Sequence, residues 1–118
     1  MAKEKDTSTR AIADLQEKAV CKALGAMQQP SSGSGKWRKG DVIHRDASIL
    51  IECKTCMTDK DSFSIKKEWI AKNKEEVFTQ RVSSGCIAYS YGPGQPNYYV
   101  IDEKLMQFLI EKLIEENK

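Results

Sequence analysis

Asp41, Glu52 and Lys54 are the residues whose types and spacing point most directly to chemistry. Glu52 and Lys54 follow a short apolar run, residues 48–51, with one residue between them. Because side chains alternate between the two faces of a strand, this carboxylate and this amine project from the same face. Two charged groups at the end of an apolar strand are costly as structure alone, so they indicate a site.

A second carboxylate is expected opposite the first. Residues 45–48 are typical of a tight turn, which makes 41–44 and 49–54 a hairpin. If the turn is centred between Asp46 and Ala47, Asp41 lies opposite Glu52, with Cβ atoms roughly 4.5–5.5 Å apart. Two carboxylates at that distance repel unless a divalent cation lies between them, and such an all-oxygen pair suits Mg²⁺ or Mn²⁺ better than Zn²⁺. A turn of odd length would offset the two acids.

Lys54 adds a positively charged group that could take part in a reaction together with the two acids. An ammonium on the same face can steady a water molecule at the metal or stabilise negative charge that develops on a phosphate. Two carboxylates, a divalent metal and a lysine are what the hydrolysis of a phosphodiester needs. The alternative is a surface hairpin whose acids and lysines are solvated ion pairs.

The rest of the chain predicts one α/β domain over residues 1–118, with elements in the order α-β-β-α-β-β-α. A first helix is capped by Ser8 or Thr9 and ends near Gly25. Strands are expected at 41–44, 49–54, 86–89 and 98–101, a second helix at 64–82 capped by Ser62 or Ser64, and a last helix after Asp102. Residues 1–8 are expected to be a flexible tail and 28–39 a mobile loop rich in Gly, Ser and basic residues.

Helical periodicity also predicts which side chains face inward. These are Ile12, Leu15, Ala19, Val20, Ala23 and Leu24 on the first helix; Ile65, Trp69, Ile70, Val77, Phe78 and Val82 on the second; and Leu105, Phe108, Leu109 and Leu113 on the last.

Composition fits an ordinary globular domain. The 118 residues are 40% hydrophobic and 31% charged, and 19 basic against 17 acidic residues give a net charge of +2. No apolar stretch reaches the roughly 18 residues that span a membrane, and the charged N-terminus does not resemble a signal peptide. We therefore expect a cytoplasmic protein with no membrane partner, in a bacterial, archaeal or phage-infected cell, with its four cysteines reduced.

Basic residues gather just before Asp41, which points to a nucleic-acid partner. Lys36, Arg38 and Lys39 can contact phosphates, and Trp37 can stack on a base or close as a lid over the domain edge. Two further lysines, Lys66 and Lys67, lie either along the DNA or on the solvated face of the second helix.

Cys53 and Cys56 form a C-x-x-C pair, which raises the alternative of a zinc site. The remaining ligands are too scattered to favour it. Cys53 lies on the strand face opposite Glu52 and is expected to pack as a small apolar residue.

The order of these features resembles the PD-(D/E)xK nuclease superfamily, and within it the archaeal and phage-type Holliday junction resolvases. The resemblance covers residues 10–101 and is carried by Glu17 on the first helix, the Ser/Gly loop 31–35, Asp41, and Glu52-Cys53-Lys54. Gly40 stands where that family often has proline. The resemblance implies a restriction-endonuclease-like core, with a mixed central sheet of about four strands flanked by helices.

By that resemblance, Asp41, Glu52 and the main-chain carbonyl of Cys53 bind the metal. Lys54 orients or activates the attacking water, and Glu17 reaches the metal through water or supports the site. Ser34 or a neighbour contacts the scissile phosphate or the metal site.

The sequence therefore predicts an Mg²⁺-dependent DNA endonuclease that hydrolyses phosphodiester bonds in branched DNA. Cutting two strands of a junction symmetrically requires two sites in one particle, so a homodimer is expected. The alternatives are a related endonuclease without junction preference, or a catalytically inactive nucleic-acid-binding module of the same fold.

Overall fold

One five-stranded mixed sheet forms the centre of the molecule. The computed structural model describes residues 8–29 and 41–118. The strands are β1 (Met27–Gln28), β2 (Asp41–His44), β3 (Ile49–Thr55), β4 (Ser84–Ser90) and β5 (Asn97–Val100), and they lie in the order β1-β2-β3-β4-β5. Only β3 and β4 are parallel; the other neighbours are antiparallel. The α/β class and the mixed sheet are confirmed, with five strands where about four were expected.

Strand β1 was missed because only two residues form it, in a stretch whose composition is typical of a loop. It adds to the edge of β2, where Met27 pairs with Ile43 and Gln28 with Val42. The sequence predicts a mobile loop over residues 28–39, but the first of these residues belongs to the sheet. Residues 30–39 lie outside the described part of the chain.

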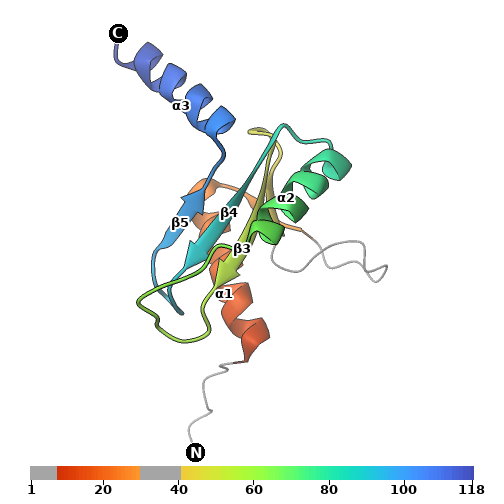
Figure 1. Cartoon of the computed structure of the whole chain (residues 1–118), viewed down its shortest axis with the longest axis vertical. Helices are drawn as coiled ribbons and strands as arrows, with labels where there is room; N and C mark the ends of the chain where they lie inside the picture. Colours follow the sequence, from red (N-terminus) through yellow and green to blue (C-terminus); the bar gives the residue numbers. More distant parts are fainter. Residues whose placement is uncertain (1–7, 30–40) are drawn as a thin grey trace, which may run out of the picture.

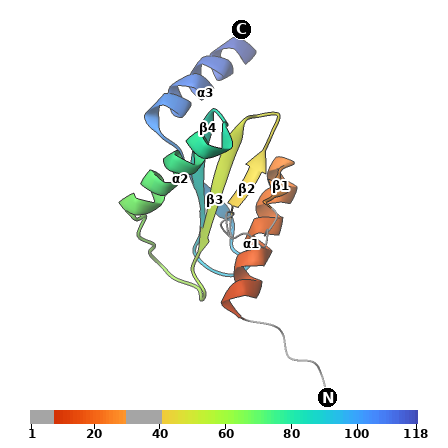
Figure 2. The same cartoon turned by 90° about the vertical axis from the view of Figure 1, so that its right-hand side faces the viewer.

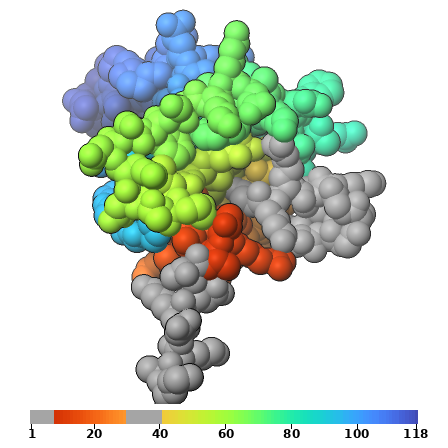
Figure 3. Space-filling view, turned by 60° about the horizontal axis from the view of Figure 1, so that its bottom comes forward, coloured from red at the N-terminus to blue at the C-terminus, as the bar shows by residue number. Residues whose placement is uncertain are grey.

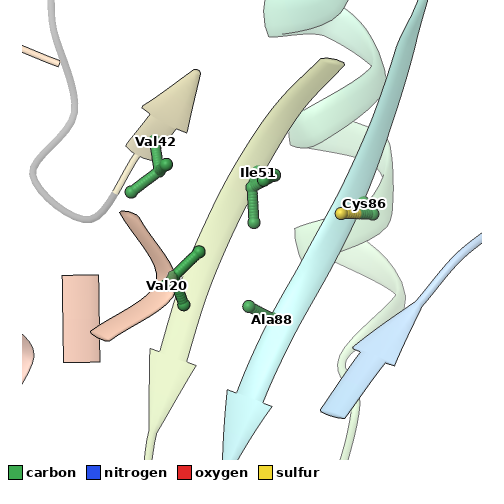
Figure 4. Close-up of a cluster of buried hydrophobic side chains, with 5 residues drawn as sticks. All are labelled: Val20, Val42, Ile51, Cys86 and Ala88. Atoms are coloured by element: carbon green, nitrogen blue, oxygen red, sulfur yellow. The ribbon is translucent and has the colours of Figure 1, made fainter. Parts of the chain in front are cut away.

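Helices α1 (Thr9–Leu24) and α2 (Lys67–Gln80) cover opposite faces of the sheet (Figure 2). The parallel strands β3 and β4 require a crossover connection, and α2 supplies it. Val20 of α1 meets Val42, Ile51, Cys86 and Ala88 of three neighbouring strands in a buried cluster (Figure 4). This cluster fixes the face of β2 and β3 that points toward α1.

Both ends of α1 lie where the sequence predicts them. The Ser8 hydroxyl accepts a hydrogen bond of 3.1 Å from the Ala11 amide, and Gly25 closes the helix in the left-handed conformation (φ 69°). The expected inward stripe is confirmed at Val20, which is fully buried, and is wrong at Leu15, which is 51% exposed. The other buried side chains of this helix are the polar Gln16 and Glu17. Polar side chains occupy this face because Gln16 finds carbonyl partners at the ends of the strands.

Helix α2 is shorter than predicted, and it begins after Lys66 without a side-chain cap. Its contact with the sheet is close, because a Cβ on Gly85 of β4 would collide with the side chains of Asn73 and Val77. Asn73 is buried and donates a 3.3 Å hydrogen bond to the Leu50 carbonyl of β3. Phe78 was expected inward but is 87% exposed, since it follows Val77 by about 100° around the helix.

Helix α3 (Glu103–Glu116) stands away from the sheet (Figure 1). Asp102 caps it as predicted, accepting a 2.9 Å hydrogen bond from the Leu105 amide. The expected inward stripe on this helix is wrong, since α3 has no buried side chain in the described structure. The apolar side chains that give this helix its periodicity therefore lie on the surface of the molecule.

Neither α1, α2 nor α3, nor any other helical stretch within residues 8–29 and 41–118, has the length and apolar character needed to cross a membrane.

Candidate active site

Asp41 and Glu52 lie directly opposite each other across strands β2 and β3. The predicted even-length turn is confirmed, and the pairing continues through Val42 with Ile51 to His44 with Ile49. Each of the two carboxylate residues is only 5% exposed. The antiparallel ladder thus holds two acids together in a largely buried position.

The carboxylate pair belongs to the face of the sheet that α2 covers. Val42 and Ile51 pack in the cluster beneath α1, and side chains alternate along a strand. Asp41 and Glu52, as their neighbours, therefore project toward the other face. In the space-filling view, yellow atoms from the strands around residues 41–50 are visible between red α1 and green α2 (Figure 3).

Lys54 projects from the same face as Glu52, and both helices position it. Its Nζ lies 4.8 Å from the centroid of the Trp69 ring on α2, and Lys66 Nζ lies 5.9 Å from the same centroid. Its main-chain carbonyl accepts a 2.7 Å hydrogen bond from Nε2 of Gln16 on α1. The amine is thereby held by a cation–π contact while the backbone is fixed from the opposite side.

Gln16 also ties β3 to the strands beyond it. The same Nε2 lies 3.4 Å from the Ala88 carbonyl of β4 and 3.0 Å from Oδ1 of Asn97 on β5. Gln16 is buried, so these bonds satisfy an amide that would otherwise be costly inside the protein. Sequence reasoning missed this residue, because a glutamine on a helix gives no signal of what it will face.

Glu17 is buried on α1 rather than solvated, with 9% of its surface exposed. Its Oε1 accepts a 3.2 Å hydrogen bond from Nε2 of Gln28, which also donates to Asp14 at 3.0 Å. Helix α1 lies against the sheet face opposite the carboxylate pair. The structure therefore places Glu17 near the site but on the other side of the sheet.

Cys53 lies between Glu52 and Lys54 on β3. Its side chain packs against the buried cluster, as expected from strand alternation. Burial raises the pKa of the Cys53 thiol, and the negative charges of Glu17 and Asp41 raise it further. Both carboxylates therefore act on the same thiol from different elements. The role of the Cys53 carbonyl in metal binding stays a prediction.

Across residues 8–29 and 41–118, no three side chains of His, Cys, Asp or Glu gather closely enough to hold a metal ion together. The candidate metal ligands among the described residues are accordingly the carboxylates of Asp41 and Glu52 alone. Two carboxylates with further positions left for water and substrate are sufficient for Mg²⁺, which is commonly held by one or two protein carboxylates and substrate phosphates.

Five expected DNA-binding residues, Ser34, Lys36, Trp37, Arg38 and Lys39, lie outside the described part of the chain. Lys66 and Lys67 are exposed at the beginning of α2. Lys66 contacts the Trp69 ring that also receives Lys54, so it lies beside the candidate site.

A cluster of aromatic side chains next to Lys54 was not predicted. Tyr89 pairs with Lys54 across β3 and β4, and Tyr98 pairs with Tyr89 across β4 and β5. Their ring centroids lie 5.7 Å apart, and Phe63 stacks on Tyr89 at 5.4 Å. The full aromatic cluster consists of Phe63, Trp69, Tyr89, Tyr91 and Tyr98. The spacing of Tyr89 at the end of β4 and Tyr91 just after it was the available signal.

Comparisons with protein-family models, with curated proteins and with solved structures give no match for this chain. The function is therefore argued from the geometry of the site.

Proposed function

We propose that this chain is an Mg²⁺-dependent DNA endonuclease of the PD-(D/E)xK superfamily, with a restriction-endonuclease-like core. The observation that carries the proposal is the pairing of Asp41 with Glu52, both 5% exposed, with Lys54 on the same strand face. Two acids so placed repel each other, and a divalent cation bound by both offsets that repulsion. The residues present therefore fit Mg²⁺, and Mn²⁺ can take its place.

When bound, the cation supplies Lewis-acid polarisation of a phosphodiester. Asp41 and Glu52 fix its position on a rigid ladder. Lys54 brings an ammonium to the same face, where it can orient the attacking water and stabilise negative charge on the phosphate in the transition state. Glu17, buried on the opposite face, is close enough to Cys53 for its charge to act on that thiol, and its hydrogen bond with Gln28 joins α1 to β1 beneath the site.

A nucleic-acid substrate fits the surroundings of Lys54. The aromatic cluster supplies ring faces and edges, and Tyr98 within it is 49% exposed. Lys66 and Lys67 supply charge at the beginning of α2, next to these rings. Bases stack on exposed aromatic side chains with roughly 1–3 kcal/mol each, which favours DNA whose bases are partly unpaired. Branched DNA such as a four-way junction meets that requirement, and we propose it as the preferred substrate.

The decisive experiment is a cleavage panel with a four-way junction, a flap, a plain duplex and a single strand, in Mg²⁺ or Mn²⁺. Glu52→Gln keeps the shape of the side chain and removes its charge, and we expect at least about a 100-fold loss of cleavage. Glu75→Gln is the matched control, because Glu75 is an exposed acid on α2. No cleavage by the wild type, or full cleavage by Glu52→Gln, refutes the nuclease. Equal cleavage of duplex and junction removes only the junction preference.

The aromatic cluster and the adjacent lysines also favour a second candidate, a nucleic-acid-binding module without catalysis. This module binds DNA with an affinity that falls steeply with salt but does not cut it. Calorimetric titration of Mg²⁺ distinguishes the two. The nuclease binds the ion through Asp41, so Asp41→Asn abolishes the heat of binding, whereas the module shows none to abolish.

A further inference from the structure

Helix α3 presents an unusually apolar surface. Six of its large apolar residues are between 41% and 57% exposed: Met106, Phe108, Leu109, Ile110, Leu113 and Ile114. Soluble proteins rarely leave so continuous an apolar surface open to water, and where they do it commonly marks an interaction site.

The two sides of α3 differ in chemistry. At about 100° per residue, Leu105, Met106, Leu109, Ile110, Leu113 and Ile114 fall on one arc that covers about half of the circumference. The opposite arc carries charged side chains, two of which form an ion pair. Lys112 pairs with Glu115 at 3.3 Å, and its ammonium lies 5.4 Å from the centroid of the Phe108 ring. The charged arc is therefore the solvent side, and the apolar arc is the side to be covered.

We propose that the apolar arc of α3 binds the α3 helix of a second copy of this chain. The helix carries four glutamates (103, 111, 115 and 116) and two lysines (104 and 112), so its net charge is −2. This charge disfavours anionic lipid surfaces and nucleic acid as partners, which favours a protein surface. The charge also opposes a second copy of the helix, so the attraction between two copies comes from the apolar arc. The apolar arc of one α3 can pack against the same arc of a second α3, because each arc covers the apolar side chains of the other.

The available area agrees with a dimer of two such helices. A large apolar side chain at about half exposure presents on the order of 100 Å², so a pair of helices buries up to roughly 1,000 Å² in total. That is near the lower limit for a specific interface and predicts association that depends on concentration. An open hollow at the base of α3 is lined by apolar Ile101, Met106 and Ile110 and by polar Asp102, Glu103, Gln107 and Glu111, so the apolar arc is continuous with it at its apolar side.

This inference does not rest on the proposed function, since it concerns a surface remote from Asp41 and Glu52. If both hold, the α3 pair places two active sites in one particle, as symmetric cutting of a junction requires.

Sedimentation equilibrium of the full chain over a range of concentrations tests the proposal. We expect the wild type to form dimers and the double variant Leu109→Glu, Leu113→Glu to remain monomeric. The α3 side chains are not buried in one copy, so the variant should melt as the wild type does when both are monomeric. Phe78→Glu is the matched control, because Phe78 is 87% exposed on α2 and should not affect association. A monomeric wild type, or a dimeric double variant, overturns the proposal.

A mixing experiment identifies the occupant as a second copy. Leu109 lies near the middle of α3, so it meets the middle of the second helix in either a parallel or an antiparallel pair. Leu109→Glu and Leu109→Lys should each be monomeric alone, and mixing them should restore dimers through opposite charges. A mixture that stays monomeric contradicts an α3–α3 interface.

Discussion

Lys54 Nζ lies 4.8 Å from the centroid of the Trp69 ring, so a residue of α2 sets the position of an amine that belongs to β3. An exposed cation–π contact contributes about 0.5–1 kcal/mol, and more when water is excluded. The contact therefore limits where the ammonium can lie relative to the carboxylate pair on the same face.

Replacing Trp69 should impair cleavage without abolishing it. Trp69→Leu frees the ammonium but keeps the charge, so we expect a loss of roughly 5- to 10-fold in kcat with little change in KM. Lys54→Met removes the charge itself and should cost about 100-fold or more. Single-turnover cleavage of the preferred substrate measures both. Equal losses for the two variants would show that Trp69 acts by another route, such as stacking on DNA.

Gln16→Leu should destabilise the fold. The substitution leaves the Lys54 carbonyl without its 2.7 Å bond and removes the amide shared with Ala88 and Asn97. Losing hydrogen bonds to buried groups typically costs about 1–3 kcal/mol in the free energy of unfolding. Urea denaturation measures it, with Gln95→Leu as a control because Gln95 is exposed. Unchanged stability in Gln16→Leu would contradict a structural role for this amide.

Gly85→Ala should also destabilise the protein, because the added methyl group collides with Asn73 and Val77. Overpacking of this kind costs typically about 1–3 kcal/mol. Val77→Ala makes room from one side, so the double variant should lose less than the two single changes added together. Additive losses in urea denaturation would show that α2 does not press on β4 at this point.

Stability should fall in alkaline solution. Burial raises the pKa of the Cys86 thiol from 9.0 to about 12, so the folded chain keeps a proton that the unfolded chain releases above pH 9. The free energy of unfolding contributed by this thiol is complete below pH 9 and is lost as the pH rises toward 12. Cys86→Ala should flatten the decline in that range relative to the wild type. Identical pH profiles for the two proteins would rule out this linkage.

The opposed acids could be predicted because two local rules agreed. Alternation along residues 49–54 set the face, and a turn of even length set the register of Asp41 with Glu52. Both rules depend only on neighbouring residues. The helix caps at Ser8 and Asp102 were predictable for the same reason.

The buried faces of the helices were harder to predict, because periodicity shows that a helix has an apolar side but not what covers it. On α1 the face toward the sheet holds Gln16 and Glu17, whose partners come from strands that lie beyond the helix in sequence. On α3 the apolar side has no covering element in the described part of the chain. The aromatic cluster was missed for a related reason, since it forms only when the chain before α2 brings Phe63 over Tyr89.

Strand β3 is paired on both edges and has a helix on each face, whereas α3 packs on neither. Amide protons of Leu50 and Ile51 should therefore exchange with deuterium only when the whole domain opens, while those of α3 in a monomer should exchange through local fraying. Glu52 and Lys54 are thus carried by the segment that opens last. The geometry of the candidate site should persist in any partly unfolded state that still keeps the sheet, and the surface proposed to join two copies should be the first to be lost.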